Sequence, residues 1–470
     1  MDEVLNLSAR AQAARIASGE ISAEALMRAT LARVGEVNGA LNAIVSLRDE
    51  TDLLDEARRA DAGPARGVLH GLPVAVKDLS NAAGLATSKG SPALAGQIAA
   101  QDDLHVARMR AAGAIVIGKT NTPEFGLGSH TFNPVHGVTC NPYDNTRTCG
   151  GSSGGAAVAL AARMLSIADG SDMMGSLRNP AGWNNVYGMR PSWGLVPGEP
   201  AGDTFLHQLA TLGPMARTPE DLSLLLGVMA GPDPRQPHEM QAPDLALDGA
   251  GKVAGRRIGW LGDWGGAFAM EAGIADLGRA ACGVLEELGC IVEEVAPPFS
   301  REALWDSWTT LRSWSVACNL APLLESPVTR DRLKPDAIWE IERGRAMSAL
   351  EVHRASVIRS QWFTRAAEVF DQYDALVMPT AQVWPFPLEW EWPKDIAGQA
   401  MDSYHRWMEV VVPASLAGLP ALAVPAGFGA EGLPMGVQLI GRRGADRALL
   451  ELGQAYHQAT RWPERHPPES

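Results

Sequence analysis

Two glycine- and serine-rich segments carry most of the side chains that could act chemically. Cys149–Gly155 reads CGGSSGG, and after an apolar helical stretch Asp169–Arg178 reads DGSDMMGSLR. Because glycine adopts backbone conformations that cost other residues energy, we expect the two segments to form loops, one on each side of a helix, that converge in space. Ser152 and Ser176 would then be neighbouring hydroxyls. A serine acts as a nucleophile only when a base activates it, so a base must be sought elsewhere.

Lys77 is the candidate base. The chain has 40 basic residues, of which only six are lysine, and Lys77 directly follows the apolar residues Val74–Val76. A coding bias towards arginine would explain the ratio but not this position. Apolar surroundings lower the pKa of a lysine, whereas arginine cannot give up its proton. On a strand, Asp78 would point to the opposite face. The residues favour a lysine-activated serine hydrolase, with a structural salt bridge of Lys77 as the alternative.

Two further motifs match known patterns. Gly113–Thr120 fits the phosphate-binding loop G-x-x-x-x-G-K-[ST], but its Ala-Ile-Val-Ile centre favours a strand, so we interpret the match as a coincidence. Gly151–Gly155 fits the G-x-S-x-G elbow of α/β-hydrolases. That elbow must follow a strand and needs acid and histidine partners, and the available His207, His353 and His405 have no distinctive context. The elbow is therefore the weaker interpretation.

The elements that position these residues alternate between strands and helices, which indicates an α/β fold with a parallel or mixed central sheet. Helices are expected over Ser22–Val37, with Ser22 as N-cap, over Leu104–Ala112 and from Ala156 onward. Strands are expected at Gly71–Asp78, Ala114–Ile117, Arg257–Leu261, Ile291–Val295, Ala375–Met378, Ala421–Pro425 and Gly436–Ile440. Asn133–Arg147 is expected to be loop, and Pro234–Gly251 an exposed connection.

Tryptophan is concentrated in one segment. Arg301–Trp407 holds nine of the fourteen tryptophans, and Trp305, Trp308 and Val316 lie at helical spacing. Helical core packing is the simpler interpretation. An aromatic wall over a substrate pocket is the alternative, since tryptophan supplies a large rigid apolar surface.

Composition limits the classes of function. The 470 residues carry a net charge of −14, which argues against nucleic-acid binding because that requires a basic face. The chain has no apolar run of about 20 residues, so no membrane partner is predicted. Its acidic start, Met1–Val4, lacks a signal peptide's basic region, and its five cysteines show no disulfide spacing. We therefore expect a cytoplasmic protein.

Several motifs in this order resemble the amidase signature family. Gly150–Gly155 followed by Gly170–Ala181 is similar to the family's signature, and Gly71–Asp78 is similar to its lysine motif. The closing strands of the family are matched by Gly418–Ala421 and Gly432–Gly441. Gly118–Asn121 and Pro123–Gly126 also fit, which accounts for the coincidental phosphate-loop match.

The resemblance covers roughly residues 20–460 and implies the amidase signature fold, with a large, mixed but mostly parallel central sheet surrounded by helices. It also implies a single domain over 1–470, in which the tryptophan-rich helical segment at about 300–407 covers the pocket.

The resemblance further implies a Ser-cisSer-Lys triad. Ser176 would be the nucleophile that forms an acyl-enzyme. Ser152, which would follow a cis peptide bond, would relay the proton of Ser176 to Lys77, the base. The oxyanion hole would be formed by backbone N–H groups of Met173, Met174, Gly175 and Ser176, and the loops would be braced by Ser153, Asp172 and Arg178. One departure is Met174, where glycine is usual in the family; we expect it to narrow the space near the scissile bond.

These implications lead to one functional prediction. We expect an amidase that hydrolyses a small to medium aryl or aliphatic carboxamide, needs neither a metal nor an organic cofactor, and forms a homodimer. The alternative is a glutaminase-type subunit of a tRNA-dependent amidotransferase. The tryptophan-rich segment and the Met-Met-Gly sequence at 173–175 favour the self-sufficient amidase.

Overall fold

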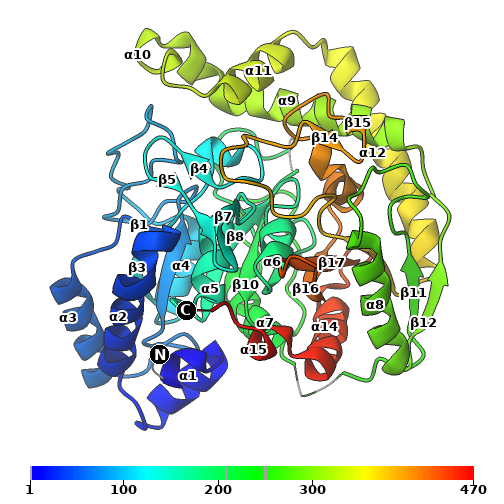
Figure 1. The fold of residues 1–470 in the computed structure, drawn as a ribbon. Helices are drawn as coiled ribbons and strands as arrows, with labels where there is room; N and C mark the ends of the chain where they lie inside the picture. The colour runs from blue at the N-terminus through cyan, green and yellow to red at the C-terminus, as the bar shows by residue number, and fades with distance from the viewer. Residues whose placement is uncertain (1–2, 207–208, 248, 250, 470) are drawn as a thin grey trace.

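A mixed eight-stranded sheet forms the centre of the computed structural model, which describes residues 3–206, 209–247, 249 and 251–469 (Figure 1). In order across the sheet the strands are β12 (Ile291–Glu294), β11 (Arg257–Trp260), β13 (Ala375–Pro379), β17 (Pro434–Ile440), β16 (Ala421–Phe428), β9 (Tyr187–Arg190), β10 (Thr211–Ala216) and β8 (Ile167–Asp172).

The expected α/β fold with a mixed sheet is confirmed, but most of the strand pairs are antiparallel. Strand β11 runs parallel to β12 and β13, whereas the other five pairs of this sheet are antiparallel. Strands β16 and β17 are joined by a short turn, and a connection of that length permits only antiparallel pairing. The expectation of a mostly parallel sheet was wrong in this respect.

A second sheet carries the candidate lysine. It has the order β1 (Ile44–Val45), β3 (Ile115–Thr120) and β2 (Pro73–Lys77), with β2 parallel to β3. The backbone N–H of Lys77 donates to Asp169 Oδ1 of strand β8 at 3.0 Å. This bond ties the end of β2 to the edge strand of the large sheet.

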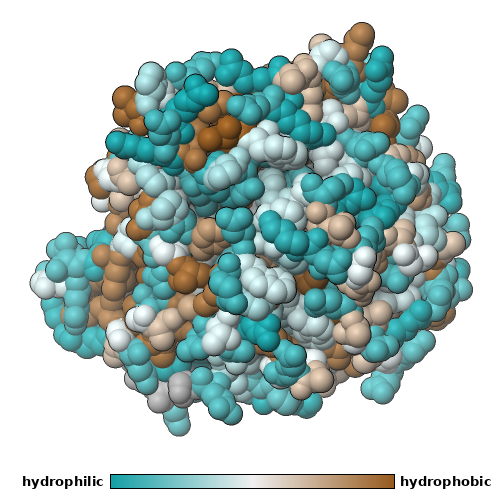
Figure 2. Space-filling model, turned by 45° about the horizontal axis from the view of Figure 1, so that its top comes forward, coloured by the Kyte–Doolittle hydropathy of each residue, from teal (hydrophilic) through white to brown (hydrophobic). Residues whose placement is uncertain are grey.

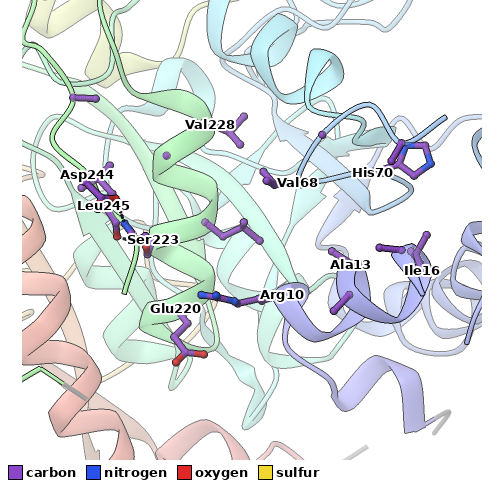
Figure 3. Close-up of a pocket in the computed structure, with 18 of the residues that line it drawn as sticks. Arg10, Ala13, Ile16, Val68, His70, Glu220, Ser223, Val228, Asp244 and Leu245 are labelled. Atoms are coloured by element: carbon purple, nitrogen blue, oxygen red, sulfur yellow. Dashed lines mark hydrogen bonds between the residues drawn. The ribbon is translucent and has the colours of Figure 1, made fainter. Parts of the chain in front are cut away.

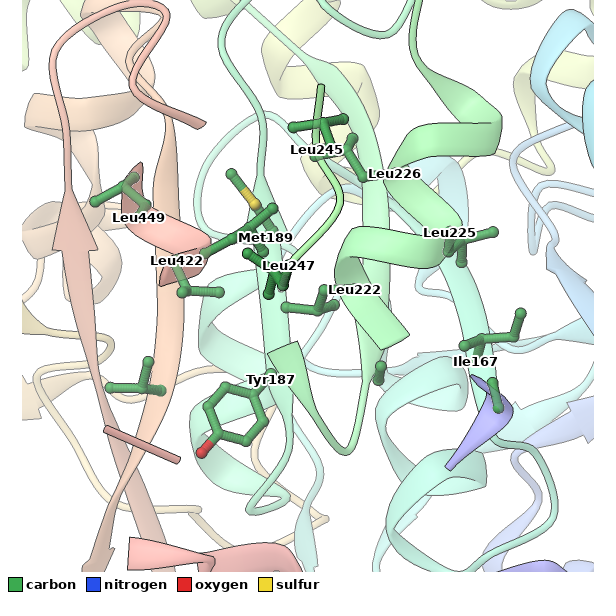
Figure 4. Close-up of a cluster of buried hydrophobic side chains, with 14 of the residues drawn as sticks. Ile167, Tyr187, Met189, Leu222, Leu225, Leu226, Leu245, Leu247, Leu422 and Leu449 are labelled. Atoms are coloured by element: carbon green, nitrogen blue, oxygen red, sulfur yellow. The ribbon is translucent and has the colours of Figure 1, made fainter. Parts of the chain in front are cut away.

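Helices cover both faces of the large sheet. Leu422 and Val424 of β16 lie in one apolar cluster with helices α7 (Pro219–Met229), α8 (Ile274–Glu287) and α14 (Asp446–Thr460), part of which Figure 4 shows. Ala421 and Ala423, which alternate with them, lie in the clusters of the opposite face. That face is packed against α5 (Gly154–Ala161) and α6 (Arg178–Trp183), the helices that follow the two candidate loops.

Four consecutive helices form a layer at the top and right of Figure 1. They are α9 (Arg301–Glu325), α10 (Pro327–Arg330), α11 (Pro335–Arg345) and α12 (Ala349–Phe370). The tryptophan-rich segment is therefore α-helical only as far as Phe370. Beyond it lie β13 and a loop with the short pair β14 (Asp395–Ile396) and β15 (Gln399–Ala400), because Pro385, Pro387 and Pro393 interrupt regular structure.

The remaining elements are mostly at the periphery. The helices are η1 (Glu3–Asn6), α1 (Ala9–Ala17), α2 (Ala23–Leu41), α3 (Glu50–Ala62), α4 (Leu104–Ala111), η2 (Glu124–Gly126), η3 (Arg406–Val411), α13 (Val412–Ala417) and α15 (Trp462–Arg465). The expected loop at Asn133–Arg147 instead contains parts of two small hairpins, formed by β4 (Phe132–Asn133), β5 (Gly137–Val138), β6 (Cys140–Asn141) and β7 (Asp144–Thr148).

The N-cap at Ser22 and the strand at the phosphate-loop match are confirmed. Ser22 accepts a hydrogen bond from the Ala25 N–H at the start of α2, as an N-cap should. Of the two glycines of the phosphate-loop match, Gly113 lies just before strand β3 and Gly118 lies within it, so the residues between them form a strand and not a loop. Within the described residues no helix is long and apolar enough to span a membrane. Hydrophilic residues spread over most of the face in Figure 2, with separate hydrophobic patches between them.

Candidate active site

Lys77 is buried at the end of strand β2 and is surrounded by hydroxyl groups. Its side chain is 1% exposed, and Nζ lies 2.7 Å from Ser152 Oγ, 2.8 Å from Ser153 Oγ and 3.1 Å from Ser171 Oγ. Asp78 faces the other way, as expected, and accepts a hydrogen bond from Ser88 Oγ at 2.6 Å. The alternative of a structural salt bridge gains no support, since among the described residues the Lys77 amine contacts hydroxyls and a carbonyl and no carboxylate.

The environment favours the neutral form of this amine. Burial lowers the pKa of Lys77 to about 7, although the negative charges of Asp169 and Asp172 oppose this shift. A neutral amine has a lone pair that can accept the proton of a neighbouring hydroxyl. Lys77 can therefore act as a general base towards Ser152 near neutral pH.

Ser152 lies on the loop that precedes helix α5. The Gly151–Ser152 peptide bond is cis, as the resemblance implied. The Ser153 N–H donates to the carbonyl oxygen of Ser176 at 3.2 Å, which places the two candidate loops side by side. Glycine is needed at 155 because a Cβ there would collide with the backbone of Asn121.

Ser176 lies between the end of strand β8 and the start of helix α6. It is 7% exposed and follows Gly175, whose φ of 80° lies in the left-handed region that favours glycine. Among the described residues, no hydrogen bond joins its hydroxyl to Ser152. The structure thus joins Lys77 to Ser152 directly, and brings Ser176 next to them through its backbone.

Asp172 holds the Ser176 loop in place. Its carboxylate accepts hydrogen bonds from the N–H groups of Gly175 at 2.9 Å and Leu177 at 3.2 Å. Arg178 donates to both of its oxygens at 3.0 Å, and Arg190 donates to Oδ1 at 3.2 Å. Burial alone would raise the pKa of Asp172, but these two guanidinium groups hold it well below its usual range.

The same contacts limit which N–H groups could stabilise an oxyanion. Of the four predicted donors, Gly175 already donates to Asp172. The N–H groups of Met173, Met174 and Ser176 have no acceptor within the described part of the chain. These three groups are the ones that a substrate oxygen could use.

The two competing motifs gain no support. Lys119, the lysine of the phosphate-loop match, is fully buried, donates to the Ser80 carbonyl and lies 3.9 Å from Asp78. Ser153, the serine of the elbow match, contacts Lys77, and no histidine within the described residues bonds to it. His353 is exposed on α12, His405 stacks on Tyr404, and His207 lies outside the described residues.

Three residues near the base had no role assigned from the sequence. Ser171 contacts the Lys77 amine, and Asp169 binds the Lys77 N–H and shifts its pKa. Both belong to the Asp169–Arg178 segment, so their closeness in sequence to Asp172 could have indicated that they lie near the base. Arg190 comes from strand β9, and no sequence pattern pointed to it.

Cavities help to delimit the site. Figure 3 shows a 680 Å³ cavity lined by α1, α7 and nearby loops, with none of the candidate catalytic residues among its walls. A smaller cavity of 240 Å³ includes Ser171 and Thr211 in its lining. Within the described residues, no group of three His, Cys, Asp or Glu side chains could hold a metal ion.

Comparison with known proteins identifies the family. A family model described as Amidase matches residues 25–450. The chain belongs to the amidase signature family. This amidase signature protein is 35% identical to a glutamyl-tRNA(Gln) amidotransferase subunit from Chloroflexus aurantiacus, over 99% of each chain. It is 32% identical to an acylamidase of Rhodococcus erythropolis, over 99% of this chain and 98% of the relative.

The fold of this amidase signature protein is also confirmed. The solved structure of a bacterial aryl acylamidase from the same family matches it with a TM-score of 0.91, at 28% identity and with 99% of both chains covered.

Met174 is the departure from the family's usual glycine. Its side chain is 3% exposed and belongs to the apolar cluster that also contains Trp183, Trp308 and Trp407. The methionine therefore packs into the aromatic cluster beside the Ser176 loop. Trp305 and Trp362 lie in the same cluster, so tryptophans of the α9–α12 layer contribute to core packing, as the simpler interpretation held.

Proposed function

We propose that this protein hydrolyses a carboxamide to a carboxylic acid and an amine or ammonia, through an acyl-enzyme on Ser176. The observation that carries the proposal is the buried Lys77 amine, 2.7 Å from the hydroxyl of Ser152. A buried lysine that contacts only uncharged groups is suited to accept a proton and poorly suited to an ion pair.

In the first half of the reaction, Ser176 Oγ attacks the amide carbonyl carbon. Its proton passes to Ser152 Oγ, and the Ser152 proton passes to Lys77 Nζ. Because Ser176 and Ser152 share no hydrogen bond in the structure, the relay requires the Ser176 hydroxyl to turn towards Ser152 when substrate binds. Catalytic hydrogen bonds often tighten only in the substrate complex.

The developing negative charge would lie on the former carbonyl oxygen. The free N–H groups of Met173, Met174 and Ser176 are placed on the loop that carries the nucleophile. Losing one donor of this kind typically costs about 3–4 kcal/mol of transition-state stabilisation. As the carbon–nitrogen bond breaks, the proton returns from Lys77 through Ser152 to the leaving amine. Water then attacks the ester carbonyl; the same relay takes up its proton and passes it to Ser176 Oγ as the ester bond breaks and the acid leaves.

The substrate is proposed to be a small to medium aryl or aliphatic amide. The relatives named acylamidase and aryl acylamidase support this class. The packing of Met174 against the tryptophan cluster supports an apolar acyl or aryl group close to the scissile bond. The proposed homodimer, the cytoplasmic location and the single domain over 1–470 stay predictions.

A second candidate function is the glutaminase-type subunit of a tRNA-dependent amidotransferase. The 35% identity to a subunit of such an enzyme over 99% of both chains favours it specifically. The two functions separate when the purified chain alone is assayed with glutamine, an anilide and an aliphatic amide. Turnover of the anilide by the chain alone supports the amidase. Release of ammonia from glutamine, with no turnover of the anilide or the aliphatic amide, supports the amidotransferase function.

Replacement of the nucleophile tests the mechanism itself. The Ser176→Ala variant should lose amide turnover and should not accumulate an acyl adduct by intact-protein mass spectrometry after mixing with an ester. Ser166→Ala is a matched control, because Ser166 is also buried (4% exposed) and its hydroxyl has no hydrogen-bond partner in the described structure. Near-native turnover by Ser176→Ala would refute the assignment of the nucleophile.

A further inference from the structure

A second large cavity lies away from the candidate triad. It has a volume of 780 Å³, within the range of small-molecule sites. Its walls come from the loop after β13, the start of α8 and the turn between β16 and β17. No residue of the candidate active site lines it. Its side chains are unusually aromatic and include Trp384, Phe386, Trp390 and Phe428.

The aromatic walls are held in fixed positions. Trp384 Nε1 donates to the Ala272 carbonyl at 3.1 Å, and a Cβ at Gly429 would lie 2.6 Å from the Trp384 ring. The Phe386 and Trp390 rings are nearly parallel, with centroids 6.3 Å apart and an interplanar angle of 16°. Trp390 is nevertheless 48% exposed. The cavity therefore presents large, rigid aromatic surfaces to whatever enters it.

The charged residues of the cavity are mainly acidic. Glu271, Asp276 and Glu431 line it together with a single basic residue, Arg147. Arg147 is engaged with Glu431 at 3.2 Å and with Asp144 at 3.7 Å. The cavity thus has a net negative charge.

Within the described residues neither Glu271 nor Asp276 forms an ion pair, and of the two only Glu271 is half-buried. One of its oxygens accepts the Trp384 N–H at 2.7 Å, and no basic group lies within ion-pair distance of it in the described part of the chain. Burial raises the pKa of Glu271 and the charge of Glu431 adds to that effect, although the Trp384 N–H and the more distant positive charge of Arg147 oppose it. A cation bound beside Glu271 would compensate a half-buried negative charge that the protein leaves unpaired.

We propose that this cavity binds an organic ammonium ion, held between the aromatic rings and the carboxylate of Glu271. Aromatic faces attract cations through the ring quadrupole, and the attraction grows when the cation is desolvated. A neutral apolar ligand would use the rings but would leave Glu271 unpaired. The proposal does not depend on the proposed amidase function, because the site contains none of the triad residues.

A pair of probes with the same shape tests the role of charge. Choline and its neutral isostere 3,3-dimethylbutan-1-ol differ at the quaternary nitrogen, and binding of each can be measured by tryptophan fluorescence and calorimetry. Choline should bind at least about fivefold more tightly than the alcohol, as expected for a cation–π contact of about 1 kcal/mol. Equal affinity for the two probes, or no binding of choline, would overturn the proposal.

Variants locate the site. Glu271→Gln and Trp390→Ala should each weaken choline binding several-fold, while the affinity for the neutral alcohol should change little in Glu271→Gln. Trp339→Ala is the matched control, because Trp339 is 42% exposed and lies on α11 outside the cavity. Circular dichroism checks that each variant is folded. Wild-type choline affinity in both folded test variants would place the ligand elsewhere and refute the site.

Discussion

Between about pH 5 and about pH 9, kcat/KM for amide hydrolysis should rise with a midpoint near pH 7, because the base must be deprotonated. Burial lowers the pKa of Lys77 from 10.5 to about 7. This shift corresponds to about 5 kcal/mol in favour of the neutral amine. At pH 7 it raises the neutral fraction from roughly one in 3,000 to about one half. Below the midpoint, the rate should fall about tenfold for each pH unit.

A change in the charge near Lys77 should move this midpoint. Of the two carboxylates that raise the pKa of Lys77 against the effect of burial, Asp169 has the larger effect. Asp169→Asn removes that charge and keeps an oxygen that can accept the Lys77 N–H. The midpoint should therefore shift to lower pH. Asp221→Asn is a control, because Asp221 is equally buried but bonds to the N–H groups of Ala9 and Arg10.

The assay is the initial rate of anilide hydrolysis across the pH range, with kcat and KM determined separately at each pH. Thermal melts at the same pH values separate loss of activity from unfolding. A flat profile, or a midpoint near that of an exposed lysine at about 10, would refute Lys77 as the neutral base. An identical midpoint in Asp169→Asn and the wild type would refute the electrostatic reasoning while leaving the family assignment intact.

Three further predictions concern stability and substrate size. From about pH 7 to about pH 10 the free energy of unfolding of the wild type should rise by about 1.4 kcal/mol per pH unit relative to that of Lys77→Met. In this range Lys77 is protonated in the unfolded chain but neutral in the folded protein. Urea titrations at each pH measure the difference. Asp172→Asn should lower the unfolding free energy by about 3–5 kcal/mol, because Arg178 and Arg190 remain buried. Denaturant melts of the wild type should show the stability contributed by ionised Asp172 at every pH above about 4, and its progressive loss below that pH. Met174→Ala should cost about 2–5 kcal/mol in the same melts and raise the rate ratio of bulky to small acyl amides.

The residues of the candidate site that were predicted belong to short, continuous motifs. Ser152 and Ser153 belong to the Cys149–Gly155 motif and Lys77 ends the apolar segment Val74–Val76, so local patterns pointed to all three, and the structure brings them into contact. The contacts that stabilise the site from a distance could not be found in this way. Arg178 donates to Gln438 Oε1 at 2.5 Å across 260 residues of sequence, and nothing in the local sequence of either residue indicates the other.

The strands were predicted well where they are apolar and poorly where they are not. Strand β8 has the sequence IADGSD, whose polar second half supplies functional residues and hides the strand pattern. Strands β9 and β10 were also missed, and all three pair in antiparallel fashion. Because alternating elements reveal which segments form the sheet but not which way each strand runs, the sequence favoured too many parallel pairs.

The site combines two buried ionisable groups whose charges must stay separate. The negative charge of Asp172 raises the pKa of Lys77, against the effect of burial. Arg178 and Arg190 both bind that carboxylate, and their positive charges partly offset its field at the amine. The arginines thus have two effects: they hold the Ser176 loop, and they let a lysine 75 residues before Ser152 remain neutral in a protein interior. This explains why a nearby carboxylate is compatible with a lysine base.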